Sequence, residues 1–586
     1  MPSSSAEALP PPRLSLTGRE WVMPDPGVER AALAISQRHA VPELVGRVLA
    51  TRGVPLDEAG AHLAPTLRDA MPDPSALADM DAAAERLAAA VRKGERVALF
   101  GDYDVDGAAS TALMTRWLRA QGVEPVVHIP DRMTEGYGPN DAAMRRLGEA
   151  ADLVICLDCG TAAPGPLAVA TKAGADVMVV DHHLAAGDLP DVLAVVNPNR
   201  PDDASGQGAL CAAGVAFLLL VAANRALRAA GAEEPKLLPL LDLVALATVA
   251  DVAPLTGLNR AFVLQGLKVM ANRRNPGLRA LGDVARLEAA PSAFHCGYVL
   301  GPRINAAGRV GRSDMGARLL STDDAQEAQG IAAVLEDDNR ARRAIEAEVQ
   351  AEAIAQVEAR GEAGPLVWAA GQGWHPGVVG IVAGRLRERY HRPALVVALE
   401  GATGRGSARG VAGLDLGGAI QRAAEHGLLL KGGGHRMAAG LTVAADGVEA
   451  AVAAIADDLA RQGAGEGGPE PLPLTGALHP GGATLDLCGW LERAGPYGAG
   501  APAPIFAFEG VRIEGARQAG ENHLAFRLSA QGARLDAIAF RAFDGEIGRA
   551  LMGAPGVVAD VAGRLEADEW RGRRRVKLMV EDVRLP

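Results

Sequence analysis

Three aspartates at alternate positions, Asp102, Asp104 and Asp106, follow directly after an apolar run at 97–100. An uninterrupted apolar run predicts a strand that is covered on both faces, as in a parallel sheet. In open α/β sheets, ligands bind beyond the carboxyl ends of the strands, which is where these carboxylates fall. Three acids at one strand end repel one another unless cations offset their charge. The spacing therefore predicts a divalent-metal site.

Two other interpretations of this acidic run exist. An Asp-x-Asp-x-Asp-Gly run also begins the calcium loop of an EF-hand, which requires a Glu at its twelfth position. That position is Leu113 here, and the residues before the run are strand-like, so the ligand pattern disfavours an EF-hand. The second interpretation is a solvated acidic turn, which stays open until further ligands are found.

Further candidate ligands follow later apolar runs. Asp158 ends a second strand-like run, the triplet Asp181-His182-His183 ends a third, and Asp251 lies in a helix-like apolar run. A single Asp after a strand is more often a helix N-cap than a metal ligand, so the ordered combination carries the weight. If the strands are parallel, these positions converge on one edge of the sheet. A dinuclear metal site requires such a convergence.

The order of these motifs resembles that of the DHH phosphoesterase superfamily, named for the triplet at 181–183. The greatest similarity is to its bacterial RecJ family, the single-strand-specific 5′→3′ DNA exonucleases, from about residue 45 to the C-terminus. Later segments that resemble the same family are 301–309, 373–380, 406–409 and 432–440. The resemblance implies an α/β fold with a DHH parallel-sheet domain and a DHHA1 α/β domain joined by a long helix, followed by a β-barrel OB-fold.

The resemblance also implies a division into domains. These are an N-terminal segment 1–45, partly disordered at Pro2–Pro12; a DHH catalytic domain 46–270; a connecting region 271–360; a DHHA1 substrate-binding domain 361–465; and an OB-fold nucleic-acid-binding domain 466–586. Residues 19–95 are Ala-rich and mostly helical, and we expect them to cap the first α/β domain.

The connecting region predicts a strut between two lobes. Ser321 and Thr322 followed by Asp323 and Asp324 are typical of a helix start, and no proline follows up to position 360. The pairs Glu336/Arg340 and Asp338/Arg342 are spaced to support a solvated helix. A strand is expected at 394–399 in the second lobe.

The resemblance assigns roles to the clustered side chains. Asp104 and Asp158 would hold one ion, and Asp106, Asp158, His182 and Asp251 would hold the other. His183 would donate to a phosphate or supply a proton, and Asp102 would lie behind the ligands or join them. Oxygen ligands with imidazole favour two Mn²⁺ or Mg²⁺ ions, and histidine favours Mn²⁺.

Substrate-binding candidates lie in the second lobe and the C-terminal region. Main-chain N–H groups of Gly433 and Gly434 can approach a phosphate closely, although a set of tight turns is the alternative. Arg309, His375, Ser407, Arg409 and His435 add donors, with Arg309, Ser407 and Arg409 expected to hold a 5′-terminal phosphate.

The C-terminal region shows alternating apolar residues at 524–528, which predicts a small barrel. OB-folds bind single strands with a basic groove and stacking aromatics, and Trp570, Arg573 and Arg574 fit that role. A solvated hairpin tip is the alternative.

Bulk composition excludes several classes of protein. A formal net charge of −12 excludes a protein that simply coats nucleic acid, so a nucleic-acid site must be locally basic. Five cysteines are too few for a disulfide framework and indicate a reducing compartment; Cys156 and Cys159 lack a second pair for zinc. No apolar run of membrane-span length and no secretory signal are recognised, so we expect a cytoplasmic protein.

The resemblance implies a 5′→3′ exonuclease that hydrolyses single-stranded DNA to nucleoside 5′-monophosphates by a two-metal mechanism in DNA repair and recombination. One alternative is a DHH-type phosphodiesterase for short oligonucleotides or cyclic dinucleotides, which would not need the barrel. The other is a binding module without metal, which the complete ligand set disfavours. Implied partners are single-stranded DNA with a 5′ end, a single-stranded-DNA-binding protein and a RecQ-type helicase; a monomer is expected.

Overall fold

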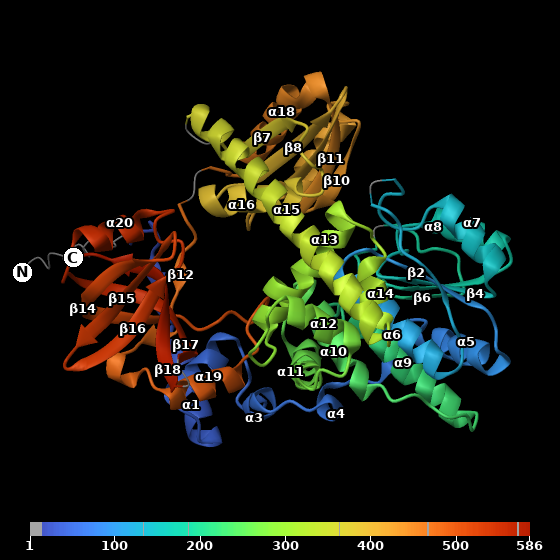
Figure 1. Cartoon of the computed structure of the whole chain (residues 1–586), viewed down its shortest axis with the longest axis horizontal. Coiled ribbons are helices and arrows are strands. Elements are labelled where there is room, and N and C mark those ends of the chain that lie inside the picture. The colour runs from blue at the N-terminus through green and yellow to red at the C-terminus, as the bar shows by residue number, and fades with distance from the viewer. Residues whose placement is uncertain (1–14, 133, 186, 362–363, 466–467, 571–572) are drawn as a thin grey trace, which may run out of the picture.

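Three lobes make up the protein, and a long helix crosses between two of them (Figure 1). The computed structural model describes residues 15–132, 134–185, 187–361, 364–465, 468–570 and 573–586. The predicted disorder at Pro2–Pro12 lies outside these residues.

The first domain contains a five-stranded, all-parallel sheet in the order β3-β2-β4-β5-β6. Its strands are β2 (Val97–Gly101), β3 (Val126–His128), β4 (Leu153–Leu157), β5 (Asp176–Val180) and β6 (Ala194–Val196). Every residue of β2 and β4 is buried, as the uninterrupted apolar runs predict. Because the strands are parallel, the motifs that follow β2, β4 and β5 meet at one edge.

Helices cover both faces of this sheet. One face carries α5 (Met80–Lys93), α6 (Val105–Ala120), α9 (Ala212–Ala229) and α10 (Leu241–Ala250), and the other carries α7 (Asp141–Ala150) and α8 (Pro164–Lys172). The first core continues into α11 (Gly257–Ala271), α12 (Pro276–Val284), the π-helical turn η3 (His295–Leu300), α13 (Gly301–Val310) and α14 (Met315–Ser321). Alternate residues of β4 point to the two layers, Ile155 to the first and Val154 to the second.

Helix α9 is 18 residues long with a mean hydropathy of 1.5, so its length and composition alone would allow it to cross a membrane. The sequence-based expectation that no run reaches this length is therefore wrong. In the structure, 72% of the helix is buried inside the protein, and α9 lies in the core of the first domain. A core helix of a soluble protein passes the same test of length and composition.

The long helix α15 (Ala325–Ala359) confirms the predicted strut. It begins after Asp324, whose side chain accepts hydrogen bonds from the backbone N–H groups of Gln326 and Glu327. Its first half packs into the core of the first domain through Leu335, and its second half packs into the second domain through Val349. The helix therefore ties the two lobes together.

The ion pairs predicted on this helix are not the ones that form. Glu336 pairs with Arg303 of α13 at 2.5 Å, and Arg342 pairs with Glu346 at 2.5 Å. Arg340 pairs with Asp337 at 3.1 Å. Because α15 has a packed face as well as a solvated one, Glu336 bonds to the neighbouring helix α13 instead of to the next turn. Arg340 and Arg342 keep partners within α15, but not the predicted ones.

The second domain contains a sheet in the order β10-β11-β9-β8-β7, in which only β7 and β8 are parallel. Its elements are β7 (Val367–Gln372), α16 (Val379–Tyr390), β8 (Ala394–Glu400), β9 (Thr403–Arg409), α17 (Leu416–Glu425), β10 (Lys431–His435), β11 (Ala438–Ala444) and α18 (Val448–Arg461). Strand β8 confirms the strand expected at 394–399. The glycines at 432–434 lie in the edge strand β10 and not in a series of tight turns.

The C-terminal domain is a closed barrel in which β14 pairs with both β15 and β17. Its elements are β13 (Gly476–Ala477), α19 (Leu485–Ala494), β14 (Phe506–Ala519), β15 (His523–Ala530), β16 (Ala533–Ala539), α20 (Glu546–Gly553), β17 (Val558–Trp570) and β18 (Arg573–Arg584). The predicted alternation is confirmed, since Leu524, Phe526 and Leu528 are buried and Arg527 is exposed.

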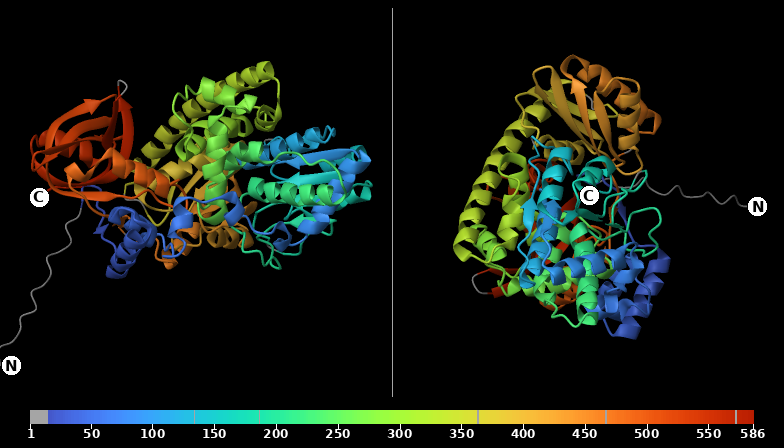
Figure 2. Two further views of the ribbon diagram at one scale, coloured as in Figure 1. Left: turned by 90° about the horizontal axis from the view of Figure 1, so that it is seen from below. Right: turned by 90° about the vertical axis from the view of Figure 1, so that its right-hand side faces the viewer.

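The N-terminal helices correct one expectation. Of the helices expected to cap the first domain, α5 does so, but α1 (Pro26–His39) and α2 (Glu43–Thr51) share the core of the C-terminal barrel. Strand β1 (Trp21–Val22) also pairs with β12 (Leu472–Pro473) ahead of that barrel. In the left view of Figure 2 the N-terminal helices, in blue, lie along the lower edge of the protein. An amphipathic helix indicates that one face is buried, but its sequence does not say against which core.

A buried carboxylate fixes this N-terminal attachment. Asp582 is fully buried and accepts hydrogen bonds from Trp21 Nε1 at 2.9 Å and from Thr17 Oγ1 at 2.8 Å. We expect Asp582→Ala to lower the free energy of unfolding by about 2–4 kcal/mol, because one buried and one half-buried donor lose their acceptor. Chemical denaturation measures this. Glu581→Ala, which breaks only the surface pair with Arg564, should change stability by less than about 1 kcal/mol; equal losses in the two variants would contradict the attachment.

Candidate active site

The turn after β2 places the first two carboxylates. Asp104 caps α6, and its Oδ1 accepts hydrogen bonds from the N–H groups of Asp106 and Gly107 at 2.9 and 3.0 Å. A Cβ on Gly107 would lie 2.5 Å from the carbonyl oxygen of Asp102, so only glycine permits this close turn. The cap engages one oxygen of Asp104, and the other is available to a cation.

Asp106 points into the domain and meets the start of α9. Its two oxygens accept hydrogen bonds from the backbone N–H groups of Ala212 at 2.6 Å and Ala213 at 2.8 Å. A helix N-terminus stabilises negative charge, so α9 helps to hold this buried carboxylate in place.

Asp158 follows β4 in a left-handed backbone conformation, with φ of 62°. Aspartate tolerates this region better than most residues do, and the turn directs its side chain to the edge of the sheet. Asp158 is buried, and neither its Oδ1 nor the Oδ1 of Asp102 has a hydrogen-bond partner among the described residues. Buried carboxylate oxygens that lack a hydrogen bond are what a bound cation would satisfy.

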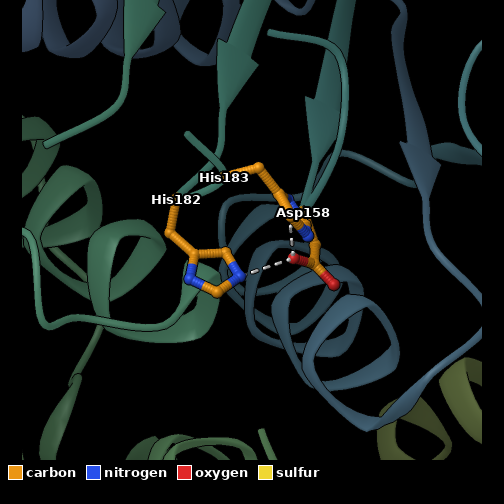
Figure 3. Close-up of side chains that lie close together, drawn as sticks. All are labelled: Asp158, His182 and His183. Atoms are coloured by element: carbon orange, nitrogen blue, oxygen red, sulfur yellow. Dashed lines mark ion pairs between the residues drawn. The ribbon is translucent and has the colours of Figure 1, made fainter. Parts of the chain in front are cut away.

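His182 lies at the centre of the carboxylates. Its Nε2 is 3.3 Å from Asp158, 3.7 Å from Asp106 and 3.8 Å from Asp251. The Nδ2 of Asn199 donates to the His182 carbonyl at 2.6 Å and holds the backbone there. Figure 3 shows the imidazoles of His182 and His183 both directed at the same oxygen of Asp158, Oδ1.

His183 is held by the first residue of its own triplet. The Nδ1 of His183 lies 2.8 Å from Asp181 Oδ1, and the other oxygen of Asp181 accepts from the Thr161 N–H. Burial opposes both charges, but the hydrogen bond and attraction between them prevail. The pKa of Asp181 is thereby lowered to about 2, and the pKa of His183 is raised to about 9.

The remaining carboxylates repel one another. Burial, followed by the charge of Asp104, raises the pKa of Asp102 to about 8. Burial and the charges of Asp106 and Asp104 raise the pKa of Asp251 to about 8. Burial and neighbouring carboxylates also raise the pKa values of Asp106 and Asp158.

These side chains form three overlapping groups, each with potential ligand atoms within 4.8 Å of one another. The groups are Asp158, His182 and His183; Asp106, His182 and Asp251; and Asp102, Asp104 and Asp158. Crowded carboxylates with unpaired oxygens and one central imidazole are chemically suited to divalent cations. The donor set therefore fits the two ions that the motif order predicts.

A pocket of about 490 Å³ lies on the second domain next to a loop of the first. Its polar lining comes from Arg132 of the first domain and from Arg405, Ser407, Lys431 and Gly433 of the second. A Cβ on Gly433 would meet no atom within 4 Å, so the backbone of β10 is open to the pocket. The protein is acidic overall, but this pocket is basic.

Arginines gather beside this pocket. Arg309 donates to the Gly377 carbonyl at 2.9 Å, and the backbone N–H of Gly377 donates to His375 Nδ1 at 3.0 Å. Burial, together with Arg132, Arg342 and Arg409, lowers the pKa of Arg309 to about 10. A Cβ on Gly380 would lie 3.0 Å from the Arg409 side chain and 3.2 Å from the Ser407 side chain. Both side chains therefore lie against the backbone of Gly380. Arg342 is paired with Glu346, but Arg132, Arg309 and Arg409 form no ion pair within the described part of the chain. Three guanidinium groups without a counter-charge favour an anion.

The structure does not bring every predicted site residue to this place. Gly434 packs its α-carbon against Ala439, and His435 is exposed at the end of β10. Arg574 is exposed on the barrel, 3.8 Å from Glu492. The side chains of Trp570 and Arg573 lie outside the described part of the chain.

Four residues near the site were not predicted as functional. Arg132 follows β3 and stacks over the Tyr103 ring at 5.4 Å; Tyr137, from the same loop, has its hydroxyl 3.4 Å from His183. Arg405 and Lys431 line the pocket. The position of Arg132 and Tyr137 beyond the end of a parallel strand was the available signal. The register that places Arg405 and Lys431 on either side of Thr442 could not be read from one sequence.

Known proteins share this architecture. Three family models match, described as the DHH family, N-terminal domain at residues 96–248, the DHHA1 domain at 363–461 and the RecJ OB domain at 475–582. The single-stranded-DNA-specific exonuclease RecJ of Dickeya dadantii is 37% identical over 565 residues, 93% of this chain and 96% of the relative. The corresponding Escherichia coli protein is 34% identical over 573 residues, again 93% and 96%.

Solved structures agree. The crystal structure of RecJ from Thermus thermophilus in complex with Mn²⁺ superimposes with a TM-score of 0.80 at 32% identity, covering 97% of this chain and 79% of that one. Its complex with Mg²⁺ gives a TM-score of 0.73 at 30% identity, with 97% and 78% coverage. Since sequence relatives match over nearly their whole length and the three family models follow the three lobes in order, this chain belongs to the RecJ family of single-stranded-DNA-specific exonucleases.

Proposed function

We propose that the protein is a metal-dependent exonuclease that degrades single-stranded DNA from the 5′ end and releases nucleoside 5′-monophosphates. The observation that carries this proposal is the pairing of two features: three groups of metal-type ligands at one sheet edge, and a basic pocket on the facing domain. A phosphodiester between them would have cations on one side and guanidinium groups on the other. Relatives named as single-stranded-DNA-specific exonucleases support the same function.

We propose roles for the residues as follows. Asp104, Asp106, Asp158, His182 and Asp251 hold two Mn²⁺ or Mg²⁺ ions, with Asp158 shared. When bound, such ions stabilise the charge on the attacking and leaving oxygens of a phosphodiester. His183, whose Nδ1 lies 2.8 Å from Asp181 Oδ1, would donate a proton or a hydrogen bond to a phosphate oxygen, and Asp102 would support the ligands from behind.

The basic pocket would determine the direction in which the DNA strand is digested. Arg309, Ser407 and Arg409 would bind the 5′-terminal phosphate, and the open β10 backbone at Gly433 would add N–H donors. With the end of the strand held there, the first phosphodiester would lie over the metal centre. Because Arg309 already bonds to the loop that contains His375, binding would draw on both lobes.

The wider assignments rest on the family resemblance. We propose that domains 46–270, 361–465 and 466–586 provide catalysis, substrate binding and single-strand binding, respectively, with Trp570, Arg573 and Arg574 contributing to the last. We further propose that the protein is a cytoplasmic monomer that cooperates with a single-stranded-DNA-binding protein and a RecQ-type helicase.

The alternative substrate is a short oligonucleotide or a cyclic dinucleotide. Deleting the barrel would not separate the two functions, because α1 and α2 share its core and would lose it. Substrate choice separates them: we expect long single strands with a 5′ end to be preferred, whereas a preference for dinucleotides would favour the alternative.

The decisive experiment compares matched strands that carry a 5′-phosphate, a 5′-hydroxyl or a blocked 3′ end, with Mn²⁺ and with a chelator. We expect metal-dependent release of mononucleotides from the 5′ end, unaffected by the 3′ block. Arg409→Gln should raise KM for the 5′-phosphorylated strand by about 10- to 100-fold, the value of one or two charge-assisted hydrogen bonds. The 5′-hydroxyl strand should be unaffected.

Arg461→Gln is a matched control, since Arg461 is a surface arginine of the same domain that pairs with Asp458 at 3.3 Å. An equal loss for both 5′ ends in Arg409→Gln would show that Arg409 does not read the terminal phosphate. Digestion that begins at the 3′ end would overturn the proposed polarity.

A further inference from the structure

Two aromatic rings face solvent at the π-helical turn η3 (His295–Leu300), one on the residue directly before it and one within it. Resting on the proposed nuclease function, we propose that Phe294 and Tyr298 form a platform on which an unpaired base of the DNA strand stacks. The inference assigns a base-binding site outside the metal ligands, the basic pocket and the barrel.

The two rings form a pair. Their centroids are 5.2 Å apart with an interplanar angle of 26°, so they are stacked. Phe294 is 62% exposed and Tyr298 is 71% exposed. The chain contains only 20 aromatic residues among 586, namely six Trp, five Tyr and nine Phe. Phe294 also contacts the His295 ring, with centroids 5.8 Å apart and an interplanar angle of 77°. Two adjacent, largely exposed rings in so aromatic-poor a protein add little to its core, and their exposed area can contact a ligand.

The turn beneath the rings is anchored firmly. Cys296 and Leu300, on the opposite side of the turn, are buried in the core of the first domain. Gly297 lies against Val249, where a Cβ would be 3.4 Å from the valine methyl group. A π-turn widens the helix locally, and such turns occur frequently at functional sites. The rings are therefore held on a rigid support.

That support is the same structure that positions the metal ligands. A Cβ on Gly301 would lie 3.2 Å from Ala250, the residue directly before Asp251. Four residues further on, the Oδ1 of Asn305 accepts a hydrogen bond from the Val105 N–H at 3.0 Å, between Asp104 and Asp106. One continuous helical segment thus contacts the ligand-bearing ends of both α10 and α6, so the platform has a fixed position relative to the metal centre.

The chemistry of the platform fits a base better than a phosphate. Two neutral rings offer no charge to a phosphate, whereas every base has a face that stacks on an aromatic ring regardless of sequence. Base pairs in a duplex are already stacked, so an isolated ring pair favours an unpaired strand. Such a contact would add affinity without adding sequence preference.

The test is an abasic scan with the full-length protein. A fluorescent 5′-phosphorylated single strand is bound in Ca²⁺ without turnover, and one abasic site is moved along it. For the wild type, we expect a sharp affinity loss of about 5- to 100-fold at one or two adjacent positions, since stacking contributes about 1–3 kcal/mol per base. Phe294→Ala/Tyr298→Ala should show a similar loss with the intact strand and no further loss at those positions.

Tyr298→Phe keeps the ring and should behave as the wild type, whereas Tyr298→Leu keeps the apolar area and should retain the defect. If the double alanine variant binds the intact strand as tightly as the wild type, or stays sensitive at the same abasic positions, the platform does not stack a base. A wild-type protein that binds no single strand would instead overturn the proposed function. If the double alanine variant binds DNA normally and loses only its binding to a protein partner, the two rings do not form a base-binding site.

Discussion

Replacing Asp158 by asparagine should reduce metal-dependent release of mononucleotides by at least about 10³-fold. Asp158 is the carboxylate common to two of the three ligand groups, and the Nε2 of His182 lies 3.3 Å from it. Metal ions contribute several kcal/mol of charge stabilisation to such reactions, and each 1.4 kcal/mol corresponds to a factor of ten in rate. Removing the charge of the shared ligand should weaken both ions together.

The same substitution should have the opposite effect on the stability of the metal-free protein. Asp158 is buried beside Asp106, Asp104 and Asp102, whose charges, with burial, raise its pKa. Asparagine keeps the shape and removes the repulsion, so the melting temperature in a chelator should rise. Stabilisation by added Mn²⁺ should become much smaller in the variant. Thermal melts with and without Mn²⁺ measure both effects.

A matched control lies at the other end of the same strand. Asp152 precedes β4, is half-exposed, and pairs with Arg96 at 2.7 Å. Asp152→Asn should leave digestion unchanged and alter stability by less than about 1 kcal/mol. If Asp158→Asn digests DNA as fast as Asp152→Asn does, the metal centre is not at this edge of the sheet.

The sequence predicted those parts of the site that lie at strand ends. Apolar runs located β2, β4 and β5, and parallel strands necessarily bring Asp104, Asp158 and His182 to one edge. Asp251 was placed correctly in a helical run, at the end of α10. Such predictions succeed because local hydrophobic pattern and strand direction are enough to fix them.

What could not be predicted depends on contacts between distant segments. Nothing local in α1 and α2 says that their apolar faces join the barrel more than 400 positions later. Glu336 had a well-spaced partner on its own helix but pairs with Arg303 of α13 instead. Tight turns were the alternative interpretation of the glycines at 432–434, but pairing with β11 makes them an edge strand. Tertiary packing decides each of these cases.

The stability of the metal-free protein should fall as pH rises, which is the reverse of the usual behaviour of carboxylates. The pKa values of Asp102 and Asp251 are raised to about 8 from a usual value near 4. A carboxyl with a raised pKa in the folded state contributes stability that is complete below its unfolded pKa and is lost as pH rises through its folded pKa. His183, whose pKa is raised to about 9, loses its contribution in the same direction. Asp181, whose pKa is lowered to about 2, makes a constant contribution to stability above pH 4.

Between pH 5 and pH 8 these effects therefore share one sign, and the melting temperature in a chelator should drop by at least about 5 °C, which corresponds to a loss of roughly 2 kcal/mol. Saturating Mn²⁺ should reverse the slope, because cations bind the deprotonated carboxylates and compete with protons. Asp158→Asn should flatten the slope in the chelator, since one member of the repelling cluster is gone. A melting temperature that is constant or rises from pH 5 to pH 8 without metal would mean that these carboxylates do not repel one another as the geometry requires.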